Sequence, residues 1–335
     1  MIEVILPDDS VLEVEENSTV EDVAYEIGTG LGDATVAGKI NGELVAKEDQ
    51  VSDGDEIEIV TPQSDEYIDV LRHSTAHVFA QALKRIYGDE VKLTIGPWTE
   101  EGFYYDIDGV EIEQEDFEDI EEEMQSIIEE DLPIEREMVS REEAEDFFED
   151  NEYKRQILDE EAAAEDQRSS GDTTEDEVSF YRQGEFRDLC KGPHVDSTGK
   201  VGGFKLLEIA GAYWRGDEEN KMLTRVYGTA FSTENELKDF LELREEAQKR
   251  DHRKIGKEMN LFTFSDLVGQ GLPMFTPKGT AMREAIIDKI NSIQERYGFE
   301  KVWIPHITKP ELYKTSGHWE KFADELFKVK SRESK

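Results

Sequence analysis

The chain has 335 residues, with 81 acidic and 38 basic side chains and a formal net charge of −43. Its single cysteine excludes an intrachain disulfide, and no run approaches the roughly 18 apolar residues that a membrane-spanning helix needs. Residues 1–4 lack the basic and apolar regions of a signal peptide, so we expect a soluble, cytoplasmic protein with no membrane or DNA partner.

The acidic side chains are spread along the whole chain, a pattern typical of proteins adapted to high salt. Such a charge argues against nucleic-acid partners, because phosphate contacts need Lys and Arg. At about 1 M salt the Debye length falls to about 3 Å, so distant carboxylates are screened and local basic clusters decide binding.

Residues 1–62 carry the pattern of a small β-grasp domain. Two short alternating segments around a turn at residues 7–10 predict a hairpin, and Ser18 with Glu21 predicts a capping box that opens a helix. Asn41-Gly42 predicts a second hairpin, and residues 57–60 a last strand. This order resembles the TGS domain of threonyl-tRNA synthetases, some GTPases and stringent-response synthetases. Ligand binding and passive packing are both open roles for it.

A second domain is expected over residues 63–230, beginning with a helix near 67–87. At about 100° per residue, one face of this helix is apolar, and His73 and His77 lie together on the opposite face. The simplest alternative is a pair of solvated histidines. The apolar face comprises Leu71, Val78, Phe79, Ala82, Leu83 and Ile86.

The rest of this domain alternates helices and strands. Helical spacing predicts an amphipathic helix within 113–131 and a helix capped by Ser140, while the polar stretch 159–177 predicts a mobile loop. Strand-like segments predict one antiparallel sheet; they are residues 178–181, 186–189, 204–209, 212–215 and 222–227.

Two pairs of zinc-type ligands share a four-residue spacing: His73 with His77, and Cys190 with His194. A zinc ion held by all four residues would activate a water molecule for attack on an ester or amide. Without metal, the histidines can serve as general base and acid. A nucleophilic Cys190 and a purely structural role are the remaining alternatives.

A linker helix is expected over 231–257, capped by Thr233 with Glu236 and ending in the clearest basic cluster of the chain. Its members are candidates for phosphate contacts: Lys249, Arg250, Arg253, Lys254 and Lys257. Residues 258–335 predict a helix up to Tyr297, a turn and a strand over 299–304, and we expect the opening of a domain whose remainder is absent.

Five segments together resemble bacterial-type threonyl-tRNA synthetases, in the order found in that family. They are residues 73–77, 102–106, 188–194, 210–217 and 250–256. In addition, Gly298, Phe299 and Pro305 resemble class II motif 1, which in the family forms the dimer interface. The resemblance implies an α+β, multidomain chain: TGS domain, editing domain with an antiparallel sheet, linker helix and an incomplete class II synthetase segment.

The resemblance also implies a function, the hydrolysis of Ser-tRNA(Thr). Residues His73 and His77 would position and activate water, while Asp188, Cys190 and His194 would line the pocket. Tyr104 and Lys154 would orient the aminoacyl ester or the terminal adenosine. Related alanyl-type domains hold zinc with the equivalent four residues, whereas the threonyl site is usually considered metal-free, so no cofactor is expected for editing.

The complete enzyme of this family would be a homodimer that uses ATP, Mg and a catalytic-domain Zn to charge tRNA(Thr). Class II motifs 2 and 3 have no counterpart before Lys335. We therefore expect background ATP–pyrophosphate exchange from this chain. The alternatives are a non-catalytic tRNA-binding fragment and a free-standing zinc-dependent deacylase; the motif 1 segment argues against the latter.

Overall fold

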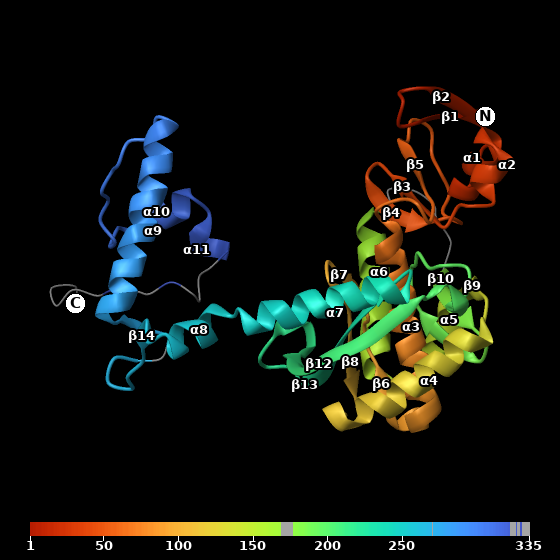
Figure 1. Ribbon diagram of the computed structural model, residues 1–335. Coiled ribbons are helices and arrows are strands. Elements are labelled where there is room, and N and C mark those ends of the chain that lie inside the picture. The colour runs from red at the N-terminus through yellow and green to blue at the C-terminus, as the bar shows by residue number, and fades with distance from the viewer. Residues whose placement is uncertain (169–176, 270, 322–325, 327–328, 330–335) are drawn as a thin grey trace, which may run out of the picture. The chain divides into compact units, whose positions relative to one another are not determined.

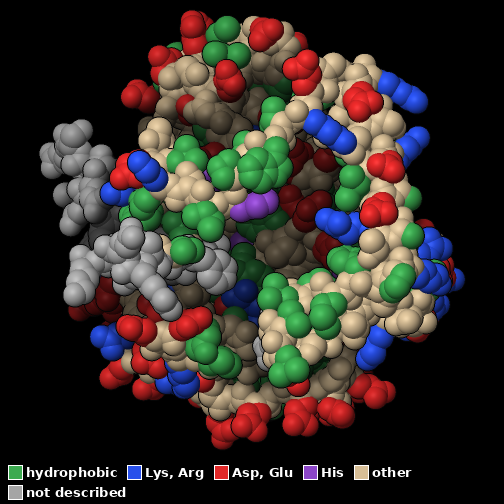
Figure 2. Space-filling model, turned by 90° about the vertical axis from the view of Figure 1, so that its left-hand side faces the viewer, with side chains coloured by type: hydrophobic (Ala, Val, Ile, Leu, Met, Phe, Trp, Pro, Cys, Tyr) green, Lys and Arg blue, Asp and Glu red, His purple; other side chains and the backbone are tan. Residues whose placement is uncertain are grey.

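The computed structural model describes residues 1–168, 177–269, 271–321, 326 and 329. The chain forms two units, Met1–Glu246 and Ala247–Lys335, which we describe separately (Figure 1). Helices and antiparallel sheets occur together, so the predicted α+β class is confirmed. The boundary between the two units falls within residues 231–257, the segment predicted as a linker helix. The other predicted domain bounds stay predictions. Figure 2 shows acidic side chains spread over one face. No helix in the described ranges is long and apolar enough to cross a membrane.

The N-terminal part of the first unit has the two predicted hairpins. Strands β1 (Ile2–Ile5) and β2 (Val11–Val14) pair with each other, and β3 (Ala37–Ile40) lies between β4 (Glu43–Ala46) and β5 (Ile57–Val60). Asn41 and Gly42 both have positive φ, as a tight hairpin turn requires. Val4, Val20 and Ile57 lie in its core.

The helix of this part begins one residue later than the predicted capping box. The N-cap of α1 (Val20–Ile27) is Thr19, which exchanges hydrogen bonds with Asp22, so the assignment to Ser18 and Glu21 was wrong. Ser18 instead accepts Val51 N–H through its backbone carbonyl. A short helix, α2 (Thr29–Gly32), follows.

Helix α3 (Tyr67–Tyr87) is the centre of the first unit. It packs against α4 (Phe117–Glu130) and against the five-stranded sheet, whose order is β12-β13-β8-β6 with β7 beside β8. These strands are β6 (Lys92–Leu93), β7 (Trp98–Thr99), β8 (Gly102–Asp108), β12 (Gly203–Tyr213) and β13 (Met222–Phe231).

A separate three-stranded sheet has the order β11-β10-β9. It is formed by β9 (Ile134–Ser140), β10 (Glu177–Gln183) and β11 (Phe186–Leu189). The prediction of a single sheet was therefore wrong, and β9 was missed. The sequence of β9 is largely polar and charged, so it lacks the apolar face by which a strand is recognised in a sequence. It is a strand because it pairs with β10.

The predicted apolar face of α3 is buried, except that Ile86 is 41% exposed. The opposite face is buried as well, with His73 only 8% and His77 only 4% exposed, so the alternative of two solvated histidines is excluded. Periodicity could not reveal this, because it identifies the apolar face of a helix but not what covers the polar one.

Two helices connect β9 with β10. Ser140 caps α5 (Arg141–Phe147), as predicted. Helix α6 (Glu152–Arg168) continues through the first half of the stretch predicted as a loop, so that prediction was wrong for residues 159–168; residues 169–176 lie outside the described part. Leu158 on this helix is fully buried, which ties the segment to the core despite its polar composition.

Helix α7 (Glu234–Lys249) has the predicted cap at Thr233 and Glu236. The second unit then contains α8 (His252–Glu258), β14 (Phe262–Thr263), β15 (Met274–Phe275), α9 (Pro277–Arg296), α10 (Pro310–Thr315) and α11 (His318–Lys321). Residues 299–304 do not form the predicted strand, since no described segment pairs with them and Val302 is 85% exposed. The remaining short 3-10 helices are η1 (Gly88–Glu90), η2 (Gln114–Asp116), η3 (Thr198–Lys200) and η4 (Trp214–Gly216).

Candidate functional site

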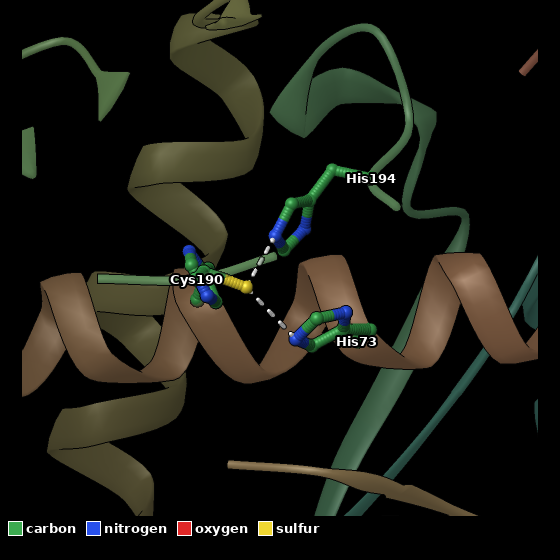
Figure 3. Close-up of side chains that lie close together, drawn as sticks. His73, Cys190 and His194 are labelled. Carbon is green, nitrogen blue, oxygen red and sulfur yellow. Dashed lines mark hydrogen bonds between the residues drawn. The ribbon is translucent and has the colours of Figure 1, made fainter. Parts of the chain in front are cut away.

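Four side chains from two distant segments meet beside α3. His73 and His77 lie on successive turns of this helix, while Cys190 and His194 come from the loop after β11. Cys190 Sγ is 3.4 Å from His73 Nε2 and 3.3 Å from His194 Nε2 (Figure 3). One ligand atom of each residue, including His77, lies within 4.8 Å of the others. The two four-residue pairs therefore form one cluster.

Hydrogen bonds to the outer nitrogens determine the tautomers of two of these rings. His73 Nδ1 lies 3.2 Å from the Pro193 carbonyl oxygen, which can only accept, so this nitrogen carries the proton. Ser74 Oγ donates to the Val70 carbonyl and lies 3.2 Å from His194 Nδ1, so His194 Nδ1 is the donor there. In each neutral ring, the lone pair of Nε2 therefore faces Cys190 Sγ.

Burial keeps the three histidines neutral. Desolvation lowers the pKa of His73 to about 4 and the pKa values of His77 and His194 well below the ordinary value. The positive charge of Lys154 lowers the pKa of His73 and His77 further. At neutral pH the cluster therefore offers uncharged nitrogen lone pairs, which can accept a proton or bind a metal.

A buried ion pair adjoins the cluster. Lys154 Nζ, from α6, lies 2.7 Å and 2.8 Å from the two carboxylate oxygens of Asp188 on β11. Tyr105 donates its hydroxyl to the same carboxylate at 3.0 Å, and Leu189 N–H donates at 2.9 Å. Tyr105 and Leu189 thus hold the Asp188 carboxylate in place, and the carboxylate in turn holds the Lys154 ammonium.

The donor set fits a zinc ion. Distances of 3.3–3.4 Å between Cys190 Sγ and the two Nε2 atoms match the edges of a tetrahedron whose metal–ligand bonds are about 2.0–2.3 Å. The outer nitrogens of His73 and His194 have the hydrogen-bond partners that metal-bound histidines usually have. His77 Nδ1 is buried and has no hydrogen-bond partner among the described residues. In addition, the Cys190 S–H group can donate to only one of the two Nε2 lone pairs that face it, which leaves the other without this proton donor.

The remaining predicted residues lie elsewhere. Tyr104, also on β8, lies on the opposite face from Tyr105, with its ring 3.9 Å from the Arg225 guanidinium carbon and 5.9 Å from the Tyr227 ring. The basic cluster lies at the end of α7 and in α8, where Arg253 pairs with Asp251. In the second unit, Gly298 has φ 82°, Phe299 is 68% exposed and Pro305 is exposed.

Sequence reasoning missed three residues that shape the site. Ser74 orients His194 and also accepts Val195 N–H, and Tyr105 holds Asp188. For Tyr105, a signal was available in the sequence: side chains alternate along a strand, so Tyr104 and Tyr105 of β8 must lie on opposite faces. Arg136 on β9 was also missed; it donates to Ser179, whose hydroxyl in turn donates to the Cys190 carbonyl.

Comparisons with known proteins identify two domain types. Residues 2–61 match the TGS domain, and residues 178–227 match the threonyl and alanyl tRNA synthetase second additional domain. The latter range includes Asp188, Cys190 and His194. The site thus belongs to a domain class found in aminoacyl-tRNA synthetases.

Relatives that match nearly the whole of this chain share one name. The chain is 56% identical to threonine–tRNA ligase of Haloarcula marismortui, 54% to that of Halobacterium salinarum and 48% to that of Staphylococcus saprophyticus. Each match covers 97% of this chain and 49% of the relative, so the chain spans about half the length of these proteins. The predicted resemblance to the threonyl-tRNA synthetases is confirmed.

Proposed function

We propose that the first unit removes serine from mischarged tRNA(Thr). The observation that carries this proposal is the buried cluster of neutral histidines and Cys190 in a chain related to threonine–tRNA ligases. Proofreading is needed because serine lacks only one methyl group of threonine, a difference worth about 1–3 kcal/mol in a binding pocket. A second pocket that excludes the threonine methyl group can hydrolyse the error.

The reaction uses groups of the cluster. His73 Nε2 removes a proton from water, and the water oxygen forms a bond to the ester carbonyl carbon. The carbon–oxygen bond to the ribose then breaks, and the proton passes from His73 to the ribose oxygen, leaving serine and uncharged tRNA. A neutral His73 can act in this way at physiological pH.

The ion pair supports this chemistry electrostatically. The Lys154 ammonium is held by Asp188 and stabilises the developing oxyanion through its charge, in a buried setting where such effects are strong. His77 positions the attacking water, while Cys190 and His194 line the opposite side of the pocket. Tyr104 is proposed to contact the nucleotide part of the substrate.

Deacylation of Ser-tRNA(Thr) at high salt tests the proposal. We expect turnover of Ser-tRNA(Thr) but slow turnover of Thr-tRNA(Thr), and a loss of about 10²–10⁴-fold in His73→Ala. His318→Ala is the matched control, because His318 is an exposed histidine of the second unit that lies outside the proposed tRNA-binding cluster. A wild-type rate equal to that of buffer would contradict the proposal and favour a tRNA-binding role without catalysis.

A zinc-dependent site is the second candidate, supported by the fit of the donor set. His73, His77, Cys190 and His194 are the residues that would hold the ion; with one position left open to water, the ion would lower the pKa of that water to about 7. Metal analysis on the sample used for deacylation separates the candidates. One zinc per chain, with activity lost on chelation and restored by zinc, supports this reading; full activity without metal supports the metal-free site.

Aminoacylation belongs to the proposal for the full-length protein. There we propose a cytoplasmic homodimer that binds ATP, Mg and Zn, with Gly298, Phe299 and Pro305 at the dimer interface. The basic cluster is proposed to contact tRNA phosphates through Lys249, Arg250, Arg253, Lys254 and Lys257. We expect residues 1–335 by themselves to give background ATP–pyrophosphate exchange, because class II motifs 2 and 3 have no counterpart among these residues.

A further inference from the structure

Trp98 lies beside the cluster and has no role in the reaction as described above. It is the first residue of β7, and its ring centroid is 5.4 Å from that of His73, at an interplanar angle of 43°. The indole is only partly buried, whereas His73 is almost completely buried. The indole of Trp98 therefore covers one side of the His73 ring, and part of the indole is exposed to solvent.

The hairpin of β7 and β8, which begins at Trp98, is held by side-chain hydrogen bonds. Arg72, the residue before His73, donates to the carbonyl oxygens of Thr99 and Glu100, the latter at 2.7 Å. On the other side of the turn, Thr229 donates its hydroxyl to the Glu101 carbonyl at 2.7 Å. Since Trp98 also pairs with Phe103 in the strand register, its backbone position is defined from three directions.

The indole makes few contacts that would explain it as a core residue. Trp98 does not belong to any of the buried clusters, and among the described residues its N–H finds no acceptor. Trp214 of the same unit provides the contrast, because it is 5% exposed and donates to Gln156 at 2.8 Å. A partly exposed aromatic face on a rigid turn is suited to stacking with a planar ligand.

The substrate of the proposed function supplies such a ligand. An ester carbonyl at His73 Nε2 is attached to a ribose, and the ribose carries the terminal base, so this base must lie just outside the cluster. Base–aromatic stacking contributes about 1–3 kcal/mol per base and needs no fixed hydrogen-bond pattern. We propose that Trp98 stacks on the terminal purine of the tRNA and thereby places the ester against His73; this inference rests on the proposed function.

Steady-state deacylation of Ser-tRNA(Thr) by Trp98→Ala tests the inference. We expect KM to rise about tenfold, equivalent to about 1.4 kcal/mol of lost binding, with kcat within about twofold of the wild type. Trp98→Phe keeps an aromatic face and should recover most of the loss. Met138→Ala is the control for removing an exposed apolar side chain, since Met138 is 50% exposed on β9.

A structural role would give a different result. If Trp98 only packs against His73, Trp98→Ala lowers kcat and the unfolding temperature while KM stays unchanged, and the inference is overturned. An unchanged KM with unchanged kcat overturns it as well. Failure of the proposed function is recognised separately, because the wild-type chain itself would then show no deacylation.

Binding of a hydrolysis-resistant probe provides a second readout. The probe is 3′-deoxy-3′-(seryl-amino)adenosine, in which an amide replaces the ester. We expect it to quench the fluorescence of the wild-type chain and of His73→Ala. In Trp98→Phe the fluorescence should stay nearly unchanged, because this variant binds the probe but lacks the indole at this position. Equal quenching of the wild type and Trp98→Phe would refute contact between the purine and Trp98.

Discussion

Replacing Asp188 with Asn tests the buried ion pair most directly. In the wild type, the side chains of Lys154 and Asp188 are 4% and 3% exposed, and the ammonium lies within 2.8 Å of both carboxylate oxygens. Asp188→Asn removes the charge but preserves the size and one acceptor for Tyr105 or Leu189. The ammonium of Lys154 is then left in the interior without its counter-ion.

The expected cost is about 3–5 kcal/mol of unfolding free energy, the usual range when one partner of a buried pair is removed. Little discount for solvent screening applies, since neither side chain is exposed. The double variant Lys154→Met/Asp188→Asn should recover most of this loss, because no unpaired charge remains. Deacylation is expected to stay impaired in both variants, because the double variant lacks the positive charge of Lys154 and in Asp188→Asn no carboxylate holds the ammonium in place.

Urea denaturation at constant high salt is the suitable assay, because urea does not change the ionic strength. The two single variants and the double variant complete a thermodynamic cycle. A loss below about 1 kcal/mol in Asp188→Asn, or a double variant as unstable as the single one, would refute the reasoning. Such a result would mean that water or another carboxylate compensates Lys154.

Three further predictions follow from single contacts. Burial lowers the pKa of His73 to about 4, so the unfolded chain binds a proton more readily, and the contribution of His73 to stability falls by about 2 kcal/mol between pH 7 and pH 5. Urea titration at both pH values should show a loss of stability, to which the buried His77 and His194 contribute in the same direction, and a pH-independent stability would contradict the prediction. Gly192→Ala should impair deacylation more than Gly216→Ala: both glycines have φ above 70°, but only at Gly192 would the new Cβ lie 2.4 Å from the Tyr181 hydroxyl. Asp49→Asn should lower stability by about 1 kcal/mol in thermal unfolding, because Asp49 binds Arg136 at 2.5 Å between the TGS part and β9; an unchanged midpoint would show that the contact contributes nothing.

Local signals were sufficient for several elements. The Asn41-Gly42 turn was predicted because two successive positive φ angles favour these residue types. The cap at Ser140 was predicted because a side-chain oxygen there can accept the free N–H of Glu143. The same kind of reasoning was one residue off at Thr19, where both Ser18 and Thr19 are suitable caps and only the backbone conformation selects one.

Elements that depend on distant partners were predicted less well. Residues 159–168 have a loop-like composition, yet they continue a helix whose first turns carry the buried side chains of Tyr153 and Leu158. The sheet was expected to be single because strand pairing cannot be read from a list of strand-like segments. Residues 299–304 have the composition of a strand but no described strand beside them, and a β-strand is defined by backbone hydrogen bonds to a neighbouring strand.

The candidate site shows the same division between local and distant information. The sequence by itself determined the residue types, their four-residue spacing and the side of α3 on which His73 and His77 lie, because a helix repeats every 3.6 residues. Only the tertiary structure decided that this side is buried, that Cys190 and His194 meet it, and that both Nε2 lone pairs face one sulfur atom. These features arise from contacts between segments more than 100 residues apart, which no local pattern encodes.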